Sequence, residues 1–140
     1  MTPVRARLWH MPQLLGVLWA FTRHTAWLPS TRPRRVDVAL MARIIRRGWV
    51  RQVTGAAFIA RDGCYIHALY VHPAWHRQGL GRALLDEAKR GRARLELWVL
   101  AQNTAARQFY ASQGFEEVLC GRGMGNDEDL PDILMIWEAT

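Results

Sequence analysis

The sequence predicts an α/β domain in which helices connect neighbouring strands of one sheet. Three features of the second half of the chain lead to this prediction. An apolar and aromatic run over Cys64–Val71 is typical of a strand, and the loop after it carries Gly79 and Gly81 just before a helical apolar pattern over Leu80–Arg90. A second strand pattern, Leu95–Leu100, follows that helix. A helix between two such strands indicates a crossover that makes the strands parallel neighbours.

The first part of the chain predicts two helices and three strands. Apolar residues recur at helical spacing between Leu14 and Phe21, and Gly48 ends the second helix at the position that glycine prefers. The predicted ranges are an edge strand over Thr2–Arg7, helices over Met11–His24 and Val36–Arg47, and strands over Trp49–Val53 and Gly55–Arg61. The inner face of the second helix is expected to consist of Val38, Met41, Ile44 and Ile45.

The last part of the chain continues the alternation of helices and strands. Apolar spacing predicts a helix over Thr104–Gln113, ended by Gly114, and then two strands over Phe115–Leu119 and Ile133–Glu138. A loop over residues 121–132 separates these strands. Because 140 residues suit one core and no repeat or linker divides them, we expect a single domain over residues 1–140.

The composition is strongly basic, with a formal net charge of +7. Lys89 is the only lysine among 19 basic residues, and the arginines are spread along the chain. A basic protein suggests a nucleic-acid partner as one hypothesis. Arginine-rich, lysine-poor usage is also what a GC-rich genome produces at exposed positions. Since no RRM, zinc-finger or clear helix-turn-helix signature is present, we expect a generally basic surface and no nucleic-acid partner.

Neither a membrane span nor a metal site is expected. The apolar run Leu14–Phe21 is far shorter than the ~20 residues that a bilayer span needs. No small-residue cleavage site follows it, so it does not match a signal peptide. Cys64 and Cys120 have no CxxC partner and too few histidines near them for zinc. One disulfide is an alternative, but two reduced cysteines in a cytoplasmic protein are the simpler expectation.

The loop that holds Gly79 and Gly81 predicts an anion-binding site. The first N–H groups of a helix lack partners within the helix, and the helix dipole adds partial positive charge at the same end. Glycines let a phosphate approach the backbone, and Arg77 and Arg82 add charge from either side. A tight strand-to-helix turn that binds nothing is the alternative. The spacing fits neither a Rossmann dinucleotide loop nor a P-loop.

Two blocks of the sequence together resemble the GNAT superfamily of acyl-CoA-dependent N-acetyltransferases. They are LYVHPAWHRQGLGRALL, over Leu69–Leu85, and NTAARQFYASQGF, over Asn103–Phe115, within a resemblance that covers about residues 50–138. The resemblance implies the GNAT fold, a central mixed sheet of six or seven strands that is splayed in the middle and flanked by about four helices. It also implies that acetyl-CoA is the co-substrate and lies in the splayed region, with no metal.

The resemblance further implies which residues hold the co-substrate. The family's loop pattern begins with Gln or Arg, where this chain has His76, and its two glycine positions match Gly79 and Gly81. The implied binding residues are Leu69, Tyr70, Val71, Arg77, Gln78, Gly79, Leu80, Gly81, Arg82 and Asn103. Backbone groups of the loop would hold the pyrophosphate, and those of residues 69–71 would bond the pantetheine arm as an added strand does.

Two residues are candidates for proton transfer. Tyr110 matches the family's common general acid, and a phenol can protonate a thiolate as it leaves. The alternative for Tyr110 is a packed aromatic beside Phe109. His67 lies within a strand and suits a general base, although a histidine satisfied on a strand face, with ordered water as the base, is an equal alternative. A backbone N–H near Val71 is implied to stabilise the oxyanion.

The acceptor is expected to be a primary amine of a small molecule that attacks acetyl-CoA directly in a ternary complex. Trp98 stands where ribosomal-protein-type N-terminal acetyltransferases carry a glutamate, which favours an aromatic-lined site. Acidic residues would attract a cationic amine and arginines would attract a carboxylate, with plain solvent exposure as the alternative for both groups. These residues are Asp127, Glu128, Asp129 and Asp132 in the loop over 121–132, and Arg32, Arg34 and Arg35 between the first two helices.

Other functions stay open at this point. The alternatives on the same scaffold are a non-catalytic acyl-CoA-binding module and a protein acetyltransferase that modifies a lysine or an N-terminus. A homodimer, formed through an exposed tryptophan or a shared C-terminal strand, is a further alternative.

Overall fold

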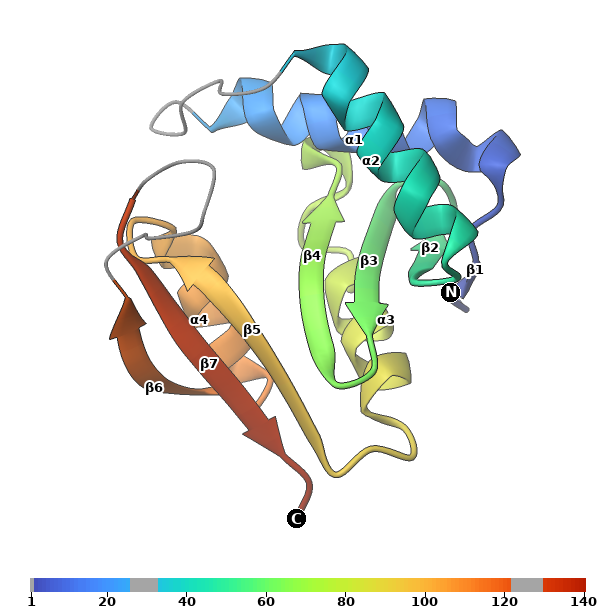
Figure 1. Cartoon of the computed structure of the whole chain (residues 1–140). Coiled ribbons are helices and arrows are strands. Elements are labelled where there is room, and N and C mark those ends of the chain that lie inside the picture. Colours follow the sequence, from blue (N-terminus) through green and yellow to red (C-terminus); the bar gives the residue numbers. More distant parts are fainter. Residues whose placement is uncertain (1, 26–32, 122–129) are drawn as a thin grey trace.

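The computed structural model of the protein describes residues 2–25, 33–121 and 130–140. The strands are β1 (Val4–Arg5), β2 (Val50–Val53), β3 (Ala57–Asp62), β4 (Tyr65–Val71), β5 (Arg94–Leu100), β6 (Glu116–Gly121) and β7 (Asp132–Glu138), and the α-helices are α1 (Met11–His24), α2 (Arg34–Arg46), α3 (Leu80–Lys89) and α4 (Thr104–Ser112). Within the described ranges, seven strands form one sheet in the order β1-β2-β3-β4-β5-β7-β6 (Figure 1). The pair β4–β5 is parallel and the other pairs are antiparallel. The predicted mixed sheet with about four helices is confirmed.

The predicted elements agree with these bounds to within two residues, and the one wrong assignment concerns α2. Pro33 has an extended backbone at the N-cap, so the helix begins at Arg34, and Arg34 and Arg35 belong to its first turn rather than to a loop. Val38 is 39% exposed, because α2 packs on its neighbours through Met41 and Ile45. The prediction that Val38 lies on the inner face is therefore wrong. Arg32 and residues 127–129 lie outside the described residues.

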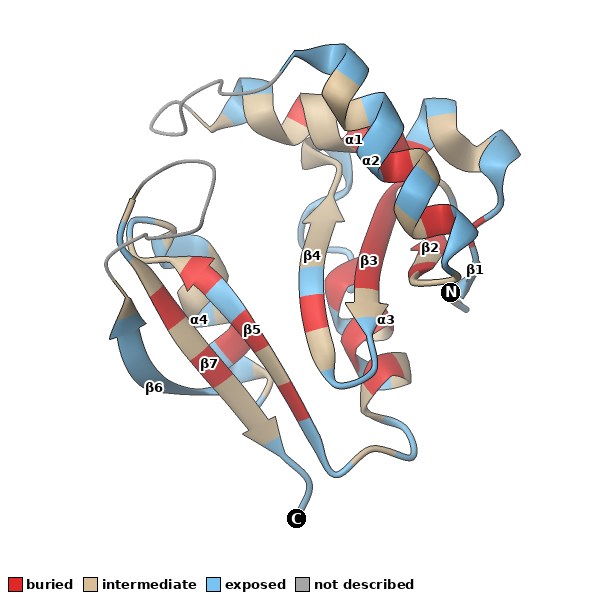
Figure 2. Cartoon of the chain, viewed as in Figure 1, coloured by how far each residue is buried: buried red, intermediate tan, exposed pale blue. Residues whose placement is uncertain are grey.

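The apolar core consists of two clusters on opposite faces of the sheet. On one face, α3 and α4 pack against the sheet through side chains such as Leu84, Leu85 and Tyr110. On the other face, α1 and α2 pack on the N-terminal half of the sheet, with Leu14 and Met41 buried there. Strand β3 separates the clusters and is buried along most of its length (Figure 2). This two-faced packing is what an α/β sheet covered by helices requires.

Strands β4 and β5 pair over two positions only and then diverge. The paired residues are Tyr65 with Glu96 and Ile66 with Leu97, and beyond them Figure 1 shows the strands opening into a V. The register between β3 and β4 shifts at this point, which makes His67 the extra residue of a β-bulge. A bulge bends its strand, so the bulge lies where β4 leaves β5. The opening between β4 and β5 is called the split below, and it confirms the predicted splay.

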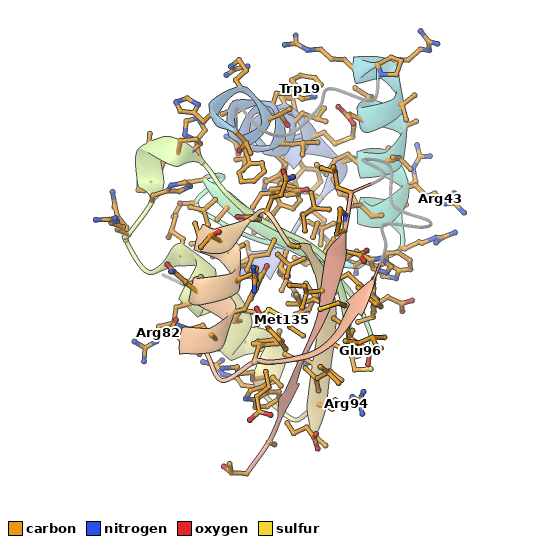
Figure 3. All side chains as sticks on the ribbon, turned by 90° about the vertical axis from the view of Figure 1, so that its left-hand side faces the viewer. Trp19, Arg43, Arg82, Arg94, Glu96 and Met135 are labelled. Carbon is orange, nitrogen blue, oxygen red and sulfur yellow. The ribbon has the colours of Figure 1, made fainter. Side chains whose placement is uncertain are left out.

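The basic residues are spread over the outside of the molecule. Arg43 of α2 and Arg82 of α3 both extend away from the body of the protein (Figure 3). Several arginines form exposed ion pairs within the described ranges, such as Arg94 with Glu96 at 3.1 Å and Arg107 with Glu117 at 2.8 Å. None of the helices in the described part of the chain has the length and apolarity that crossing a bilayer requires.

Candidate active site

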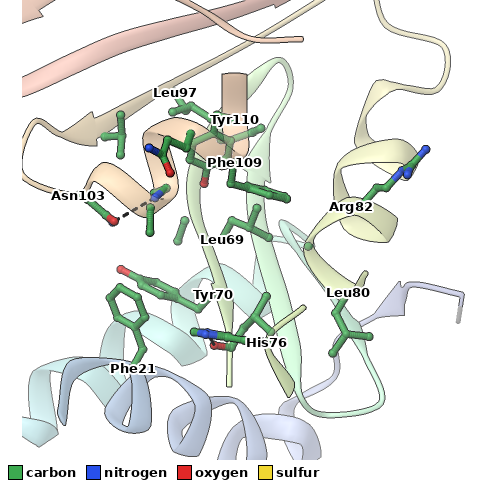
Figure 4. Close-up of a pocket in the computed structure, with 18 of the residues that line it drawn as sticks. Phe21, Leu69, Tyr70, His76, Leu80, Arg82, Leu97, Asn103, Phe109 and Tyr110 are labelled. Carbon is green, nitrogen blue, oxygen red and sulfur yellow. Dashed lines mark hydrogen bonds between the residues drawn. The ribbon is translucent and has the colours of Figure 1, made fainter. Parts of the chain in front are cut away.

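A cavity of about 900 Å³ occupies the split. Its walls come from β4, β5, α4, the loop before α3 and the first residue of β7, with Phe21 of α1 at one side (Figure 4). The predicted site residues in its lining are His67, Leu69, Tyr70, Val71, Arg77, Gly79, Leu80, Gly81, Arg82, Asn103 and Tyr110. Gln78 is exposed in the loop and does not line the cavity. The fold thus brings two distant sequence blocks together around one cavity.

The loop before α3 has the backbone geometry of an anion site. Gly79 is the N-cap of α3 with a φ of 80°, and Arg77 also has a positive φ, of 63°, which is uncommon for a residue with a side chain. No side chain caps α3 and its first turn contains no acidic residue. The first bond within the helix runs from the Ala83 N–H to the Gly79 oxygen. The N–H groups before Ala83 and the positive end of the helix dipole are therefore available to an anion.

The roles of Gly81 and Arg82 differ from the predicted ones, which were to let a phosphate approach the backbone and to add positive charge beside it. A Cβ atom at Gly81 would lie 3.1 Å from the Phe109 ring, so the absence of a side chain lets α3 pack closely against α4. The Arg82 side chain points away from the cavity (Figure 4) and its Nε lies 3.8 Å from the Asp86 carboxylate. The charge that the sequence places at Arg82 thus lies outside the cavity, and the backbone contributes most to the anion site.

The strand register determines which backbone groups of β4 face the split. The His72 N–H donates to the Ala56 oxygen at 2.8 Å, which marks a hydrogen-bonded pair of β3 and β4. Such pairs alternate along an antiparallel ladder, so Tyr70 bonds β3, whereas the N–H and C=O groups of Leu69 and Val71 point into the split. Tyr70 reaches the cavity through its side chain instead, in contrast to the backbone contact expected for it.

The backbone of β5 faces the split from the other side. The Ala101 N–H donates to the Pro131 oxygen at 2.9 Å, and the Glu96 N–H donates to the Cys64 oxygen at 2.9 Å. The backbone N–H and C=O groups of the odd-numbered β5 residues therefore bond β7, and those of the even-numbered β5 residues face β4. Since β4 and β5 pair only near Tyr65, the backbone carbonyls of Trp98 and Leu100 lie along the open edge of β5.

His76 supplies a contact that the family pattern does not describe. Its Nε2 lies 3.0 Å from the Val71 oxygen, and the imidazole N–H donates to this carbonyl. Val71 is one of the two β4 residues whose backbone points into the split. An amide N–H of a ligand that bonds Val71 would therefore replace the contact with His76.

Asn103 has a structural role beside any role in binding. Its side-chain oxygen accepts a hydrogen bond from the Ala106 N–H at 3.1 Å and so caps α4 (Figure 4). We expect Asn103→Ala to lower the free energy of unfolding by about 1 kcal/mol, measured by chemical denaturation. Asn103→Ser should keep the cap and the stability. If Asn103 also contacts the co-substrate, the serine variant will bind acetyl-CoA more weakly although its stability is unchanged.

Tyr110 is buried in the cluster beneath α4, with its ring tilted against Phe109 and Phe115. It is 7% exposed and lines the cavity. No buried side-chain oxygen lacks a hydrogen-bond partner in the described ranges, and no partner is found there for the Tyr110 hydroxyl, so this hydroxyl opens to the cavity. Burial raises the pKa of Tyr110. The phenol is thus held in its protonated form, as a general acid requires.

His67, the bulge residue of β4, is held between aromatic rings. It stacks on Trp49 with ring centroids 4.9 Å apart and meets Tyr65 edge-on at 4.6 Å. Desolvation lowers the pKa of His67, and the charge of Asp62 opposes this change. The imidazole is therefore neutral at pH 7, as a general base requires. His67 and Tyr110 both line the same cavity.

The lowered pKa of His67 leads to a prediction on pH dependence. If His67 is the base, kcat/KM will show an acidic limb below about pH 6.5, where the imidazole gains a proton, in addition to the pH dependence that comes from ionisation of the amine itself. Folding stability will also decrease there, because the unfolded chain takes up this proton more readily than the folded one. His67→Gln should lower kcat/KM and remove the acidic limb. A profile of kcat/KM against pH tests this, and an unchanged limb in the variant would exclude His67 as the base.

Sequence reasoning did not identify Tyr65 and Phe21 as cavity residues, whereas it did associate Trp98 with an aromatic-lined acceptor site. All three line the cavity. The available signal was the alternation of side chains along a strand, which places Tyr65 on the same side as His67. Phe21 contacts Tyr70 at a centroid distance of 5.0 Å, a contact between distant parts of the chain that no local pattern predicts.

The comparisons with known proteins agree with this geometry. A family model described as an acetyltransferase (GNAT) domain matches residues 39–117, which is more than half of the chain. The protein therefore belongs to the GNAT acetyltransferase family.

Relatives and solved structures show what the chain is similar to. It is 31% identical over 97 residues to the peptidyl-lysine N-acetyltransferase YiaC of Escherichia coli, covering 67% of this chain and 65% of YiaC. It is 42% identical over 69 residues to the ribosomal protein bS18-alanine N-acetyltransferase of E. coli, covering 46% and 47%. The aligned regions thus span less than two thirds of these relatives. The fold matches yncA of Salmonella typhimurium, a putative acetyltransferase solved with acetyl-CoA, with a TM-score of 0.70, 23% identity and coverage of 99% and 93%.

Proposed function

We propose that this protein transfers the acetyl group of acetyl-CoA to a primary amine. The main support is one cavity with two complementary ends, the uncapped N-terminus of α3 at one end and the open edge of β4 beside Tyr110 and His67 at the other. Coenzyme A has the same order of groups, with a pyrophosphate, then two amides, then the thiol. The structural relative that was solved with acetyl-CoA supports the same co-substrate.

The residues of the cavity fit acetyl-CoA group by group. The backbone N–H groups at the start of α3 would hold the pyrophosphate, since Gly79 keeps this position open and no acid competes there. The N–H and C=O groups of Leu69 and Val71 would bond the amides of the pantetheine arm, as a peptide does when it adds to a sheet edge. The thioester supplies an activated acetyl carbon at the narrow end of the split.

Acetyl transfer in this cavity needs two proton transfers. The amine nitrogen attacks the carbonyl carbon of the thioester, a C–N bond forms, and the carbonyl oxygen gains negative charge that a backbone N–H of β4 stabilises. The C–S bond then breaks, and Tyr110 donates its proton to the departing thiolate. His67 takes the proton that the amine nitrogen loses, directly or through water. The products are the N-acetylated amine and coenzyme A.

The acceptor amine is the less defined half of the reaction. The departure at Trp98 disfavours an N-terminal protein acetyltransferase and favours an aromatic-lined acceptor site. YiaC is named for lysine in peptides, and the second relative for the alanine of a ribosomal protein. We therefore propose a primary amine as the acceptor class, with a small-molecule amine as the first candidate.

An assay of thiol release and product mass tests the proposed function. The protein is incubated with acetyl-CoA and a panel of primary amines that includes free alkylamines, arylamines and lysine-containing peptides. We expect amine-dependent release of coenzyme A with a mass increase of one acetyl group on the amine. Tight acetyl-CoA binding without any turnover across the panel would instead indicate an acyl-CoA-binding module.

A further inference from the structure

The charged groups that line the cavity lie at separate places. Arg77 belongs to the loop before α3, at the end proposed for the pyrophosphate, whereas the Arg82 side chain on the first turn points away from the cavity (Figure 4). Asp132, the first residue of β7, is the carboxylate among the described lining residues. The cavity therefore has a basic end and, across the split beside β5, an acidic one.

The indole of Trp98 and the carboxylate of Asp132 lie close together on one face of the sheet. Trp98 pairs with Leu134 and Leu100 pairs with Asp132, and every second side chain of a strand shares a face. Both groups contact the same glycine: a Cβ atom at Gly121 would overlap the Asp132 carboxylate and would lie 3.0 Å from Trp98 Cζ3. Gly121 thus provides the space in which these side chains sit.

Tyr65 forms the opposite wall from β4. It pairs with Glu96 in the parallel register, so its ring lies on the same face as the side chains of Glu96 and Trp98. Burial raises the pKa of Tyr65, and the charges of Glu96 and Asp132 raise it further. The negative charge of Asp132 is therefore effective at the Tyr65 ring. Two aromatic walls and a carboxylate border the space in front of the bulge at His67.

We propose that Tyr65, Trp98 and Asp132 form the acceptor subsite and that it selects a primary alkylammonium. This inference rests on the proposed acetyl transfer and specifies its acceptor. Aromatic faces attract an ammonium group, and a nearby carboxylate strengthens the attraction in a partly desolvated site. A flexible aliphatic chain that ends in an ammonium fits between the rings, whether it belongs to a lysine in a peptide or to a free diamine. The bound ammonium releases one proton to solvent through water before its nitrogen, now a neutral amine, attacks the thioester. A neutral arylamine gains nothing from the carboxylate.

The test compares three acceptors: Nα-acetyl-lysine methylamide, 1,5-diaminopentane and aniline. We expect Asp132→Asn to lower kcat/KM for the two cationic amines about tenfold, and to change the value for aniline and the KM for acetyl-CoA by less than about twofold. Trp98→Leu should cause a similar loss for the cations, whereas Trp98→Phe keeps an aromatic face and most of the activity. Asp86→Asn, which changes the net charge equally on exposed α3, is the matched control and should behave as the parent.

The two sources of the ammonium are distinguished in the same experiment. A higher kcat/KM for the lysine amide than for the diamine would indicate a peptide, whose backbone can bond the open edge of β5, and the reverse would indicate a free amine. The proposal is overturned if the parent protein prefers aniline, or if both Asp132→Asn and Trp98→Leu stay within about twofold of the parent for the cations.

A binding measurement separates this inference from the proposed function. If no amine is acetylated, calorimetric titration of 1,5-diaminopentane into the protein saturated with coenzyme A still tests the subsite. If the diamine binds the parent protein and binds Asp132→Asn about tenfold more weakly, the subsite is supported even though no acetyl transfer takes place. No binding to the parent protein would overturn it.

Discussion

Replacing Gly79 by valine weakens acetyl-CoA binding about tenfold or more, a loss of about 1.4 kcal/mol in binding free energy. Gly79 is the N-cap of α3 with a φ of 80°. This backbone conformation is strongly unfavourable for a β-branched residue such as valine. The first turn would have to move, and its N–H groups would no longer converge on the pyrophosphate. Titration calorimetry with acetyl-CoA measures the change in Kd.

Gly91 provides a matched control at the other end of the same helix. It follows α3 with a φ of 70°, and a Cβ atom there would meet no atom within 4 Å. Gly91→Val therefore introduces a similar backbone strain, of roughly 1–3 kcal/mol, away from the cavity. Both variants should melt at lower temperature, but only Gly79→Val should lose affinity. Equal affinities in the two variants would show that the start of α3 does not hold acetyl-CoA.

Replacing Tyr110 by phenylalanine lowers kcat about 100-fold, the size expected for loss of a general acid. The ring keeps its packing against Phe109 and Phe115, so the Kd for acetyl-CoA should change by less than about twofold. Because burial raises the pKa of Tyr110, the parent should show no loss of activity from ionisation of this residue at neutral pH. Steady-state kinetics with a saturating amine, together with acetyl-CoA titration, measure both quantities.

Tyr70→Phe is the control for this substitution. Tyr70 also lines the cavity and is partly buried, but it lies on β4 rather than on α4. We expect a much smaller change in kcat than for Tyr110→Phe. A kcat for Tyr110→Phe close to that of the parent would exclude Tyr110 as the proton donor and favour water in that role.

Local sequence patterns predicted the helices and strands because most of these elements are determined by neighbouring residues in the sequence. Glycines at helix ends and apolar periodicity set the bounds of α1, α3 and α4 to within one residue. The inner face of α2 was harder to predict, since Val38 and Leu40 are apolar yet exposed. Which apolar side chains of a helix become buried depends on how it packs against α1, and periodicity does not contain this information.

The parts of the site that lie in one short stretch of sequence were predicted, and the parts that depend on contacts between distant segments were not. The glycine loop and Tyr110 lie in compact motifs, whereas the bulge at His67 arises from the pairing of β4 with β3. That pairing also decides that the backbone of Tyr70 is turned away from the split and that those of Leu69 and Val71 face it. The contacts of Gly81 with Phe109 and of Gly121 with Trp98 join residues far apart in the sequence, so only the three-dimensional structure shows them.

The melting temperature of the protein with and without acetyl-CoA tests the central claim most directly. A ligand present at about 100 times its Kd stabilises the fold by about 2.7 kcal/mol, which corresponds to several degrees for a domain of this size. We predict such a rise with acetyl-CoA, and a rise of about half that size or less in Gly79→Val at the same concentration, because a tenfold larger Kd leaves only about 1.4 kcal/mol of stabilisation. An unchanged melting temperature of the parent protein at millimolar acetyl-CoA would contradict the claim that the split between β4 and β5 binds this co-substrate.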